Sequence, residues 1–122
     1  MVPAAVQAAI PADIDRAFAR YTNLAEELAP VLEKAQDRKS AEAAAPELAA
    51  LLLHVCDART ELSGIQSLSP EVSADVVRKY EVAMRRNWGK VYEHIFRLQQ
   101  NECYKAAAFS RQFRLLCMIL SK

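Results

Sequence analysis

Two histidines and three cysteines are the side chains best suited to bind a metal or act as nucleophiles: His54, His94, Cys56, Cys103 and Cys117. A di-iron carboxylate bundle needs Glu-x-x-His on facing helices, but a leucine and a valine stand three residues before the two histidines. The C-x-x-C-H motif of attached haem and the H-E-x-x-H motif of zinc proteases are also absent. Two glycines in 122 residues leave no phosphate-binding glycine loop. The sequence therefore predicts no catalytic residue, no cofactor and no metal site, and a protein that is not an enzyme.

The spacing of these residues leaves two alternatives open. His54 and Cys56 lie about 200° apart around a helix, so they cannot share a metal within one turn. Bundle cores do build sites from several helices, and a metal-binding or enzymatic bundle that combines His54, His94 and a cysteine is one alternative. Three cysteines without C-x-x-C spacing favour buried reduced thiols. A single cross-helix disulfide from Cys56 to Cys103 or Cys117 is the other alternative, if the protein is exported.

Basic and aromatic side chains interleave in the second half of the chain, a composition that suits base stacking beside a phosphate backbone. They are Arg78, Lys79, Arg85, Arg86, Lys90 and Arg97 with Tyr80, Trp88, Tyr92 and Phe96. Five acidic residues share this segment, its aromatic residues fall on the predicted buried face, and the formal net charge of the chain is only +1. We therefore expect a solvated, salt-bridged helix face and no nucleic-acid partner.

Four amphipathic segments must position these residues, and they indicate an all-α fold. Hydrophobic spacing of three and four predicts helices over about 13–36, 40–63, 70–100 and 102–120. Short connections favour antiparallel neighbours, so we expect one domain, 1–122, that forms an antiparallel helical bundle of three long helices plus a C-terminal fourth helix. The alternative to a break near Asn101 is a third helix that continues to the C-terminus. Residues 1–12 are expected to form an N-terminal arm that docks Val2, Val6 and Ile10 on the bundle.

The segment 40–63 is the predicted centre of the bundle. Its seam consists of Ala44, Leu48, Leu51, Val55, Ala58 and Leu62. Ser40 is expected to cap its start, and Gly64 to end it in a left-handed conformation. Pro30 and Pro46 should bend their helices rather than break them. Caps are also predicted for the other helices, at Asp13, Ser69 and Asn101.

The last apolar stretch carries the predicted interaction surface. We expect an exposed strip of Phe109, Phe113, Leu116 and Leu120, through which the C-terminal helix binds a protein partner or a second copy of the chain. The alternative use of this stretch is to close the core. No apolar run approaches the roughly 20 residues of a membrane-spanning helix. These features predict a non-enzymatic interaction or structural module, with a cytosolic adaptor or chaperone-like bundle that binds a partner helix as the alternative.

Residues 37–48 resemble a pattern found in uncharacterised helical-bundle modules of exported bacterial proteins and lipoproteins. The pattern is roughly D-x-x-S-A-x-A-A-P-x-L, and the matching residues are Asp37, Ser40, Ala41, Ala43, Ala44, Ala45, Pro46 and Leu48. Those modules also carry a bend near the C-terminus, to which Asn101 and Tyr104 are similar, although Lys105 and Ala106 replace its glycine and serine. The resemblance implies an extracytoplasmic helical module and transfers no catalytic residue. Localisation stays open between the periplasm, if a signal has been removed, and the cytoplasm.

Overall fold

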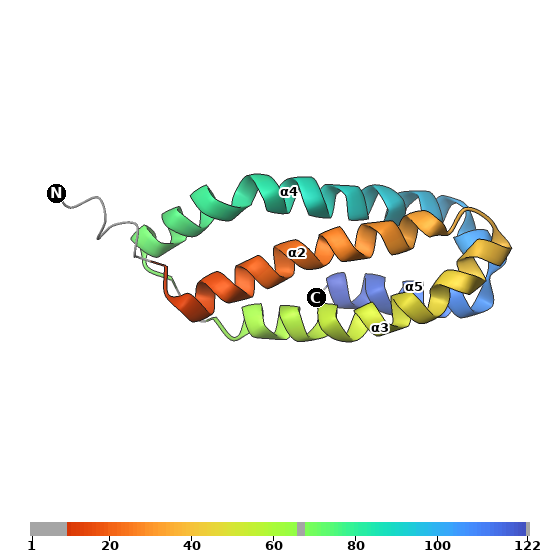
Figure 1. Cartoon of the computed structure of the whole chain (residues 1–122), viewed down its shortest axis with the longest axis horizontal. Coiled ribbons are helices and arrows are strands. Elements are labelled where there is room, and N and C mark those ends of the chain that lie inside the picture. Colours follow the sequence, from red (N-terminus) through yellow and green to blue (C-terminus); the bar gives the residue numbers. More distant parts are fainter. Residues whose placement is uncertain (1–9, 66–67, 122) are drawn as a thin grey trace.

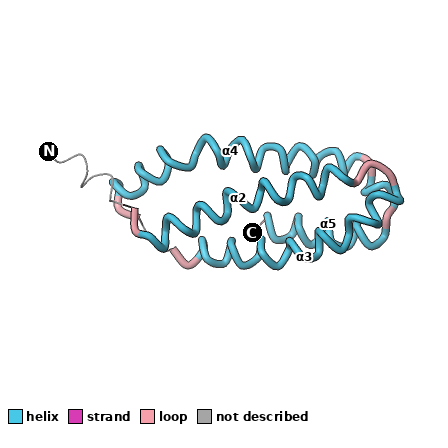
Figure 2. Tube along the Cα trace, viewed as in Figure 1, coloured by secondary structure: helices cyan, strands magenta, loops and turns pink. Residues whose placement is uncertain are grey.

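The computed structural model describes residues 10–65 and 68–121, which form a bundle of α-helices. The helices are α2 (Ala12–Lys34), α3 (Arg38–Ser63), α4 (Pro70–Gln100) and α5 (Ala107–Leu120), and a short turn, η1 (Glu102–Lys105), joins the last two. Figure 1 shows consecutive helices running in opposite directions, and the loops gather at the two ends of the bundle (Figure 2). The expected all-α bundle of three long helices and a shorter fourth helix is confirmed. The expected N-terminal arm lies mostly outside the described residues.

The order in which the helices pack differs from that of a simple up-and-down bundle. Helix α2 packs closely against both α3 and α4, and α3 packs against α5, whereas α4 has no comparably close pairing with α3 or α5. Hydrogen bonds join Tyr80 to Asp15 and Trp88 to Tyr21, so the residue numbers of α2 and α4 rise together along their contact. Neighbours in sequence are therefore antiparallel, but the closely packed pair α2 and α4 is parallel.

The core lies where α2, α3 and α5 meet and extends along α4. The predicted seam of α3 is largely buried, with Leu51 and Leu62 only partly so. The largest fully buried side chains are Leu28, Leu32, Leu48, Val55, Val91, Leu98, Phe109 and Leu116. All four α-helices contribute to this set, so the bundle has one continuous core rather than two.

The caps of α3 differ from the prediction. Asp37, not Ser40, is the N-cap: its carboxylate accepts from the Ser40 N–H at 2.8 Å, and the Ser40 hydroxyl accepts from the Asp37 N–H at 3.0 Å. This reciprocal capping box starts the helix at Arg38. Gly64 ends the helix with φ −74°, so the predicted left-handed end is wrong. Because Gly64 donates back to carbonyls of the last turn, a right-handed end satisfies its N–H.

Of the other predicted caps, the one at Ser69 is confirmed and the one at Asp13 is wrong, and the two internal prolines do not break their helices. Ser69 caps α4 as predicted, with its hydroxyl accepting from the Val72 N–H at 3.2 Å and Pro70 in the first helical position. Asp13 is not a cap, because α2 begins one residue before it, after Pro11, without a side-chain cap. Both helices with internal prolines continue through them without a break.

The break between α4 and α5 falls at the predicted place but has an unexpected form. Asn101 is the C-cap of α4 and precedes η1, and the N-cap position of α5 is Ala106, which has no side-chain cap. The four residues that follow, Glu102, Cys103, Tyr104 and Lys105, all have φ between 52° and 61°. A left-handed helical conformation costs L-residues roughly 1–2 kcal/mol each, so this turn is strained.

Candidate functional site

The predicted interaction strip on α5 is not at the surface. Phe109, Phe113 and Leu116 are buried, and Leu120 is partly buried against the core. Because α5 lies along α3, the bundle itself uses the apolar stripe of α5. The prediction of an exposed strip is therefore wrong for these residues, and the alternative, that the last apolar stretch closes the core, is correct.

An apolar groove instead lies between α4 and α5, which do not pack closely against one another. Its walls are Tyr92, Ile95 and Gln99 from α4 and Cys117, Leu120 and Ser121 from α5, and its volume is about 300 Å³. The three α4 residues recur at steps of three and four, which places them on one face of the helix. Of the predicted strip, only Leu120 reaches this groove.

The α4 wall of the groove continues as an exposed aromatic row. Tyr92 is 50% exposed and Phe96, one turn further along, is 62% exposed. The Tyr92 ring lies 6.4 Å from the ring of Trp88, which stacks on Tyr21 at 4.5 Å and donates from Nε1 to the Tyr21 carbonyl at 3.1 Å. The exposed Tyr92 ring therefore lies next to a buried aromatic pair that joins α4 to α2.

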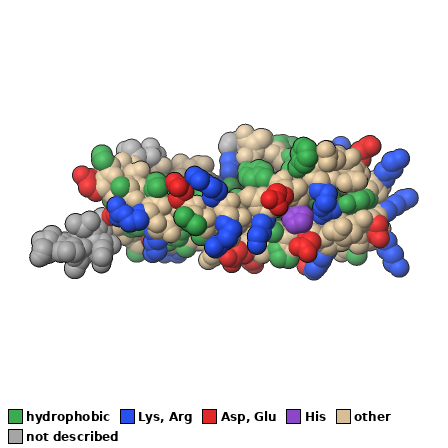
Figure 3. Space-filling view, turned by 90° about the horizontal axis from the view of Figure 1, so that it is seen from above, with side chains coloured by type: hydrophobic (Ala, Val, Ile, Leu, Met, Phe, Trp, Pro, Cys, Tyr) green, Lys and Arg blue, Asp and Glu red, His purple; other side chains and the backbone are tan. Residues whose placement is uncertain are grey.

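Basic side chains flank the groove on both helices. Arg85 precedes Tyr92 by seven residues and Arg114 precedes Ser121 by seven, so each shares a helix face with a groove residue. Helix α5 carries Arg111 and Arg114 and no acidic residue. Figure 3, a view onto the α4 side of the bundle, shows hydrophobic patches set among basic and acidic side chains. The groove itself is lined by apolar and uncharged polar side chains, and Arg85 and Arg114 lie two helical turns from its residues on the same helix faces.

A larger cleft of about 430 Å³ lies between α2 and α4, and its lining is polar. The buried Asn87 donates from Nδ2 to the Thr22 carbonyl and to Glu26 Oε1, both at 3.3 Å, and accepts at Oδ1 from Arg86 Nε at 3.3 Å. His94 lies 4.0 Å from Glu33 through Nε2. Since these groups bond to one another, the cleft is an interhelical polar network that joins α2 to α4.

The structure does not bring the histidines and cysteines into one cluster. His54 and Cys56 are exposed on α3, and His94 lies in the cleft between α2 and α4. Within residues 10–65 and 68–121, no three His, Cys, Asp or Glu side chains are placed to hold a metal ion. All three cysteines are free thiols, and burial raises the pKa of the Cys103 thiol to about 11.

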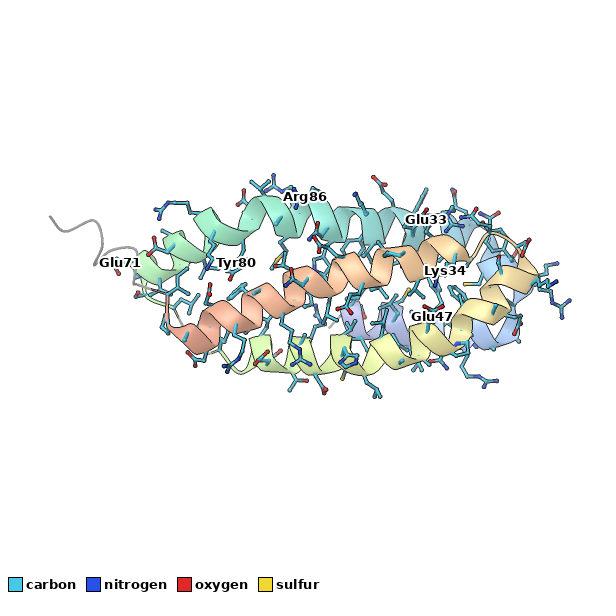
Figure 4. All side chains as sticks on the ribbon, in the orientation of Figure 1. Glu33, Lys34, Glu47, Glu71, Tyr80 and Arg86 are labelled. Carbon is cyan, nitrogen blue, oxygen red and sulfur yellow. The ribbon has the colours of Figure 1, made fainter. Side chains whose placement is uncertain are left out.

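Much of the basic stretch of α4 is engaged in pairs with acidic residues. Arg78 pairs with Asp75, Lys79 with Asp15 at 2.8 Å and Arg85 with Glu81 at 3.4 Å. Hydrogen bonds from Lys79 and Tyr80 lower the pKa of the Asp15 carboxyl. Lys34 and Glu47 likewise point toward one another from α2 and α3, 2.8 Å apart (Figure 4). The three pairs of Arg78, Lys79 and Arg85 give the basic stretch of α4 the salt-bridged character expected from its sequence.

Arg97 is the residue of this region whose role the sequence did not indicate. Its guanidinium donates to the carbonyls of Leu32 and Ala35 at 3.0 and 2.8 Å and to the Tyr104 hydroxyl at 2.7 Å. It therefore joins the end of α2 to η1 through α4. Its position among other basic residues on α4 gave no signal that its partners would be backbone carbonyls.

Comparison with models of protein families, with curated proteins and with solved structures finds no match to this chain. Among the described helices, none combines the length and the apolar character needed to cross a membrane.

Proposed function

We propose that this protein is a non-enzymatic interaction module that holds an amphipathic helix of a protein partner in the groove between α4 and α5. The observation that carries the proposal is the apolar groove itself, which α4 and α5 leave open and whose walls are more apolar than those of the larger cleft between α2 and α4. Helix-in-groove recognition places apolar side chains of one helix face into such a groove. Tyr92 and Phe96 are aromatic side chains of the kind that carry binding energy at interfaces.

Charge selects the type of partner helix. Arg85 on α4 and Arg114 on α5 share helix faces with groove residues, and α5 carries no acidic residue. The other basic residues in this half of α4 face α2: Arg86 and Lys90 line the cleft against it, and Arg97 bonds to its carbonyls. A helix with acidic residues beside its apolar face would complement this surface and associate faster at low salt. We therefore expect an acidic amphipathic helix as the partner. A setting in the bacterial envelope rests on the sequence resemblance alone and is a separate proposal.

The test is a titration of the protein with three labelled peptides of about five helical turns, followed by fluorescence anisotropy. One peptide has leucines on one face and glutamates on the other, the second replaces each glutamate with lysine, and the third scrambles the first. The acidic amphipathic peptide should bind, and the other two should bind at least tenfold more weakly. Equal binding of the scrambled peptide, or no binding of the acidic peptide, would contradict the proposal.

A matched pair of variants locates the binding. Tyr92→Ser removes an aromatic wall of the groove, and loss of such an anchor costs about 2 kcal/mol or more, at least about thirtyfold in affinity. Val82→Ser is the control, because Val82 is also an exposed apolar residue of α4 but does not line the groove. Equal weakening by both substitutions would show that the peptide binds elsewhere.

A further inference from the structure

The turn between α4 and α5 conflicts with its own sequence. Four consecutive residues, Glu102 to Lys105, have positive φ, and none of them is glycine. L-residues visit this conformation singly rather than in runs. From Lys90 to Ser121 the chain contains no glycine or proline, and residues 99–108 are rich in Gln, Glu, Lys and Ala, which favour an α-helix. The local sequence therefore prefers one continuous helix at the place where the structure has a left-handed turn.

Tertiary contacts hold the turn in place. Arg97 donates from Nη1 to the Tyr104 hydroxyl and the Ala35 carbonyl, and from Nη2 to the Leu32 carbonyl. The Asn101 side chain donates to the Arg97 carbonyl at 2.8 Å, and Cys103 is buried under the turn. The turn thus persists because the surrounding bundle fixes it, which is the condition under which strained conformations survive.

Straightening of the turn would carry α5 away from α3. Phe109, Phe113 and Leu116 would then lose their buried surroundings, so a lone chain cannot keep the straight form. The place beside α3 fits α5 of a second copy as well as the chain's own α5, because the contacting residues are the same. Short strained hinges are known to favour this kind of exchange.

We propose that two copies of this chain exchange α5. In each copy residues 101–106 become α-helical, α4 and α5 join into one helix of about 77 Å, and each α5 packs against α3 of the other copy. The exchange keeps the buried contacts of α5 and relieves the left-handed turn in both chains. It is opposed by the loss of the contacts that hold the turn, including the Arg97–Tyr104 hydrogen bond and the burial of Cys103, and by the entropy of association. This inference does not depend on the proposed helix-binding function.

Glycine substitutions in the turn test the exchange. Glu102 and Lys105 are exposed, so Glu102→Gly with Lys105→Gly removes no buried side chain. Glycine adopts positive φ without steric cost and is unfavourable inside a helix, so the double variant should favour the closed monomer. The matched control is Glu93→Gly, because Glu93 is exposed and lies within a helix in both the monomer and the exchanged dimer.

The measurement is light scattering after size exclusion, on the full chain with reducing agent, at several concentrations and after prolonged incubation. The wild-type chain should form a dimer whose Kd the double glycine variant raises at least about tenfold. Glu93→Gly should change that Kd by no more than about twofold. A wild-type chain that stays monomeric throughout, or a dimer that the turn glycines do not weaken more than the control, would overturn the proposal.

A distance measurement separates the exchange from an ordinary surface dimer. Positions 85 on α4 and 118 on α5 are both exposed, and each can carry a spin label on a non-natural residue. With unlabelled chains in excess, the distance between the two labels is the distance within one chain. In the joined helix this separation is about 50 Å, far longer than across the antiparallel helices of the monomer. A dimer that keeps the short separation would rule the exchange out.

Discussion

At the scale of single residues, the three cysteines differ in their exposure to solvent, and we expect them to differ in reactivity. The thiolate is the reactive form, and with a pKa of about 11 the Cys103 thiol is about one part in a thousand ionised at pH 8. Cys103 is also shielded from solvent, whereas Cys56 is exposed. Iodoacetamide at pH 8 should therefore modify Cys56 long before Cys103, as peptide mass mapping would show. In urea all three thiols should react, and equal rates in the native protein would contradict the observed burial.

The sequence predicted the redox state of the cysteines but not the exposure of each one. The prediction of reduced thiols is confirmed, but the prediction that they are buried is wrong for Cys56. The exposed position of Cys56 could not be read from the sequence, because it stands directly after the buried Val55 in an apolar run of α3. Which neighbours of a helix seam are covered depends on where the next helix packs.

At the scale of elements, Arg97 joins three parts of the fold, the end of α2, α4 and η1, through its hydrogen bonds. Arg97→Ala leaves the carbonyls at the end of α2 and the Tyr104 hydroxyl without their charged donor, and hydrogen bonds to charged groups contribute about 1.5–3 kcal/mol. We expect the free energy of unfolding to fall by about this amount. Urea titration with an unchanged m-value would measure it.

Two further variants make this prediction specific. Arg97→Lys should recover little of the loss, because an ammonium cannot reproduce the guanidinium fork that reaches three acceptors. Arg85→Ala removes another arginine of α4 whose partner, Glu81, is exposed, and should cost less than about 1 kcal/mol. If the Ala substitutions at 85 and 97 cost the same, the network around Arg97 would not stabilise the fold as described.

The sequence predicted some helix ends correctly and others wrongly, and the physical reasons differ from one end to the next. Ser69 followed by Pro70 is a local signal, and the structure follows it. Both Asp37 and Ser40 can cap a helix, and the sequence alone does not tell which one stands first in a capping box. The left-handed turn after Asn101 had no local signal at all, because tertiary contacts impose it against local preference.

At the scale of the whole molecule, periodicity predicted the helices and most of their buried faces, but not the order of packing. The pairing of α2 with α4 brings Trp88 onto Tyr21 and leaves Tyr92 and Phe96 half exposed. The prediction that the aromatic residues of this stretch are buried is therefore wrong for these two. Spacing along one helix does not show which of its faces a neighbouring helix covers.

The position of α5 determines whether the molecule has one core or a core with an attached tail. Leu115 and Leu116 are adjacent, yet Leu115 is 41% exposed and Leu116 is fully buried. Leu116→Ala should therefore lower the free energy of unfolding by about 2–5 kcal/mol. Leu115→Ala should change it by no more than about 0.5 kcal/mol.

Because α5 shares its buried contacts with α3, the Leu116 variant should still unfold in one transition that fluorescence of Trp88 and circular dichroism report together. Two separate transitions, or equal effects of the two substitutions, would mean that α5 is an appendage and that α2, α3 and α4 form a core without it.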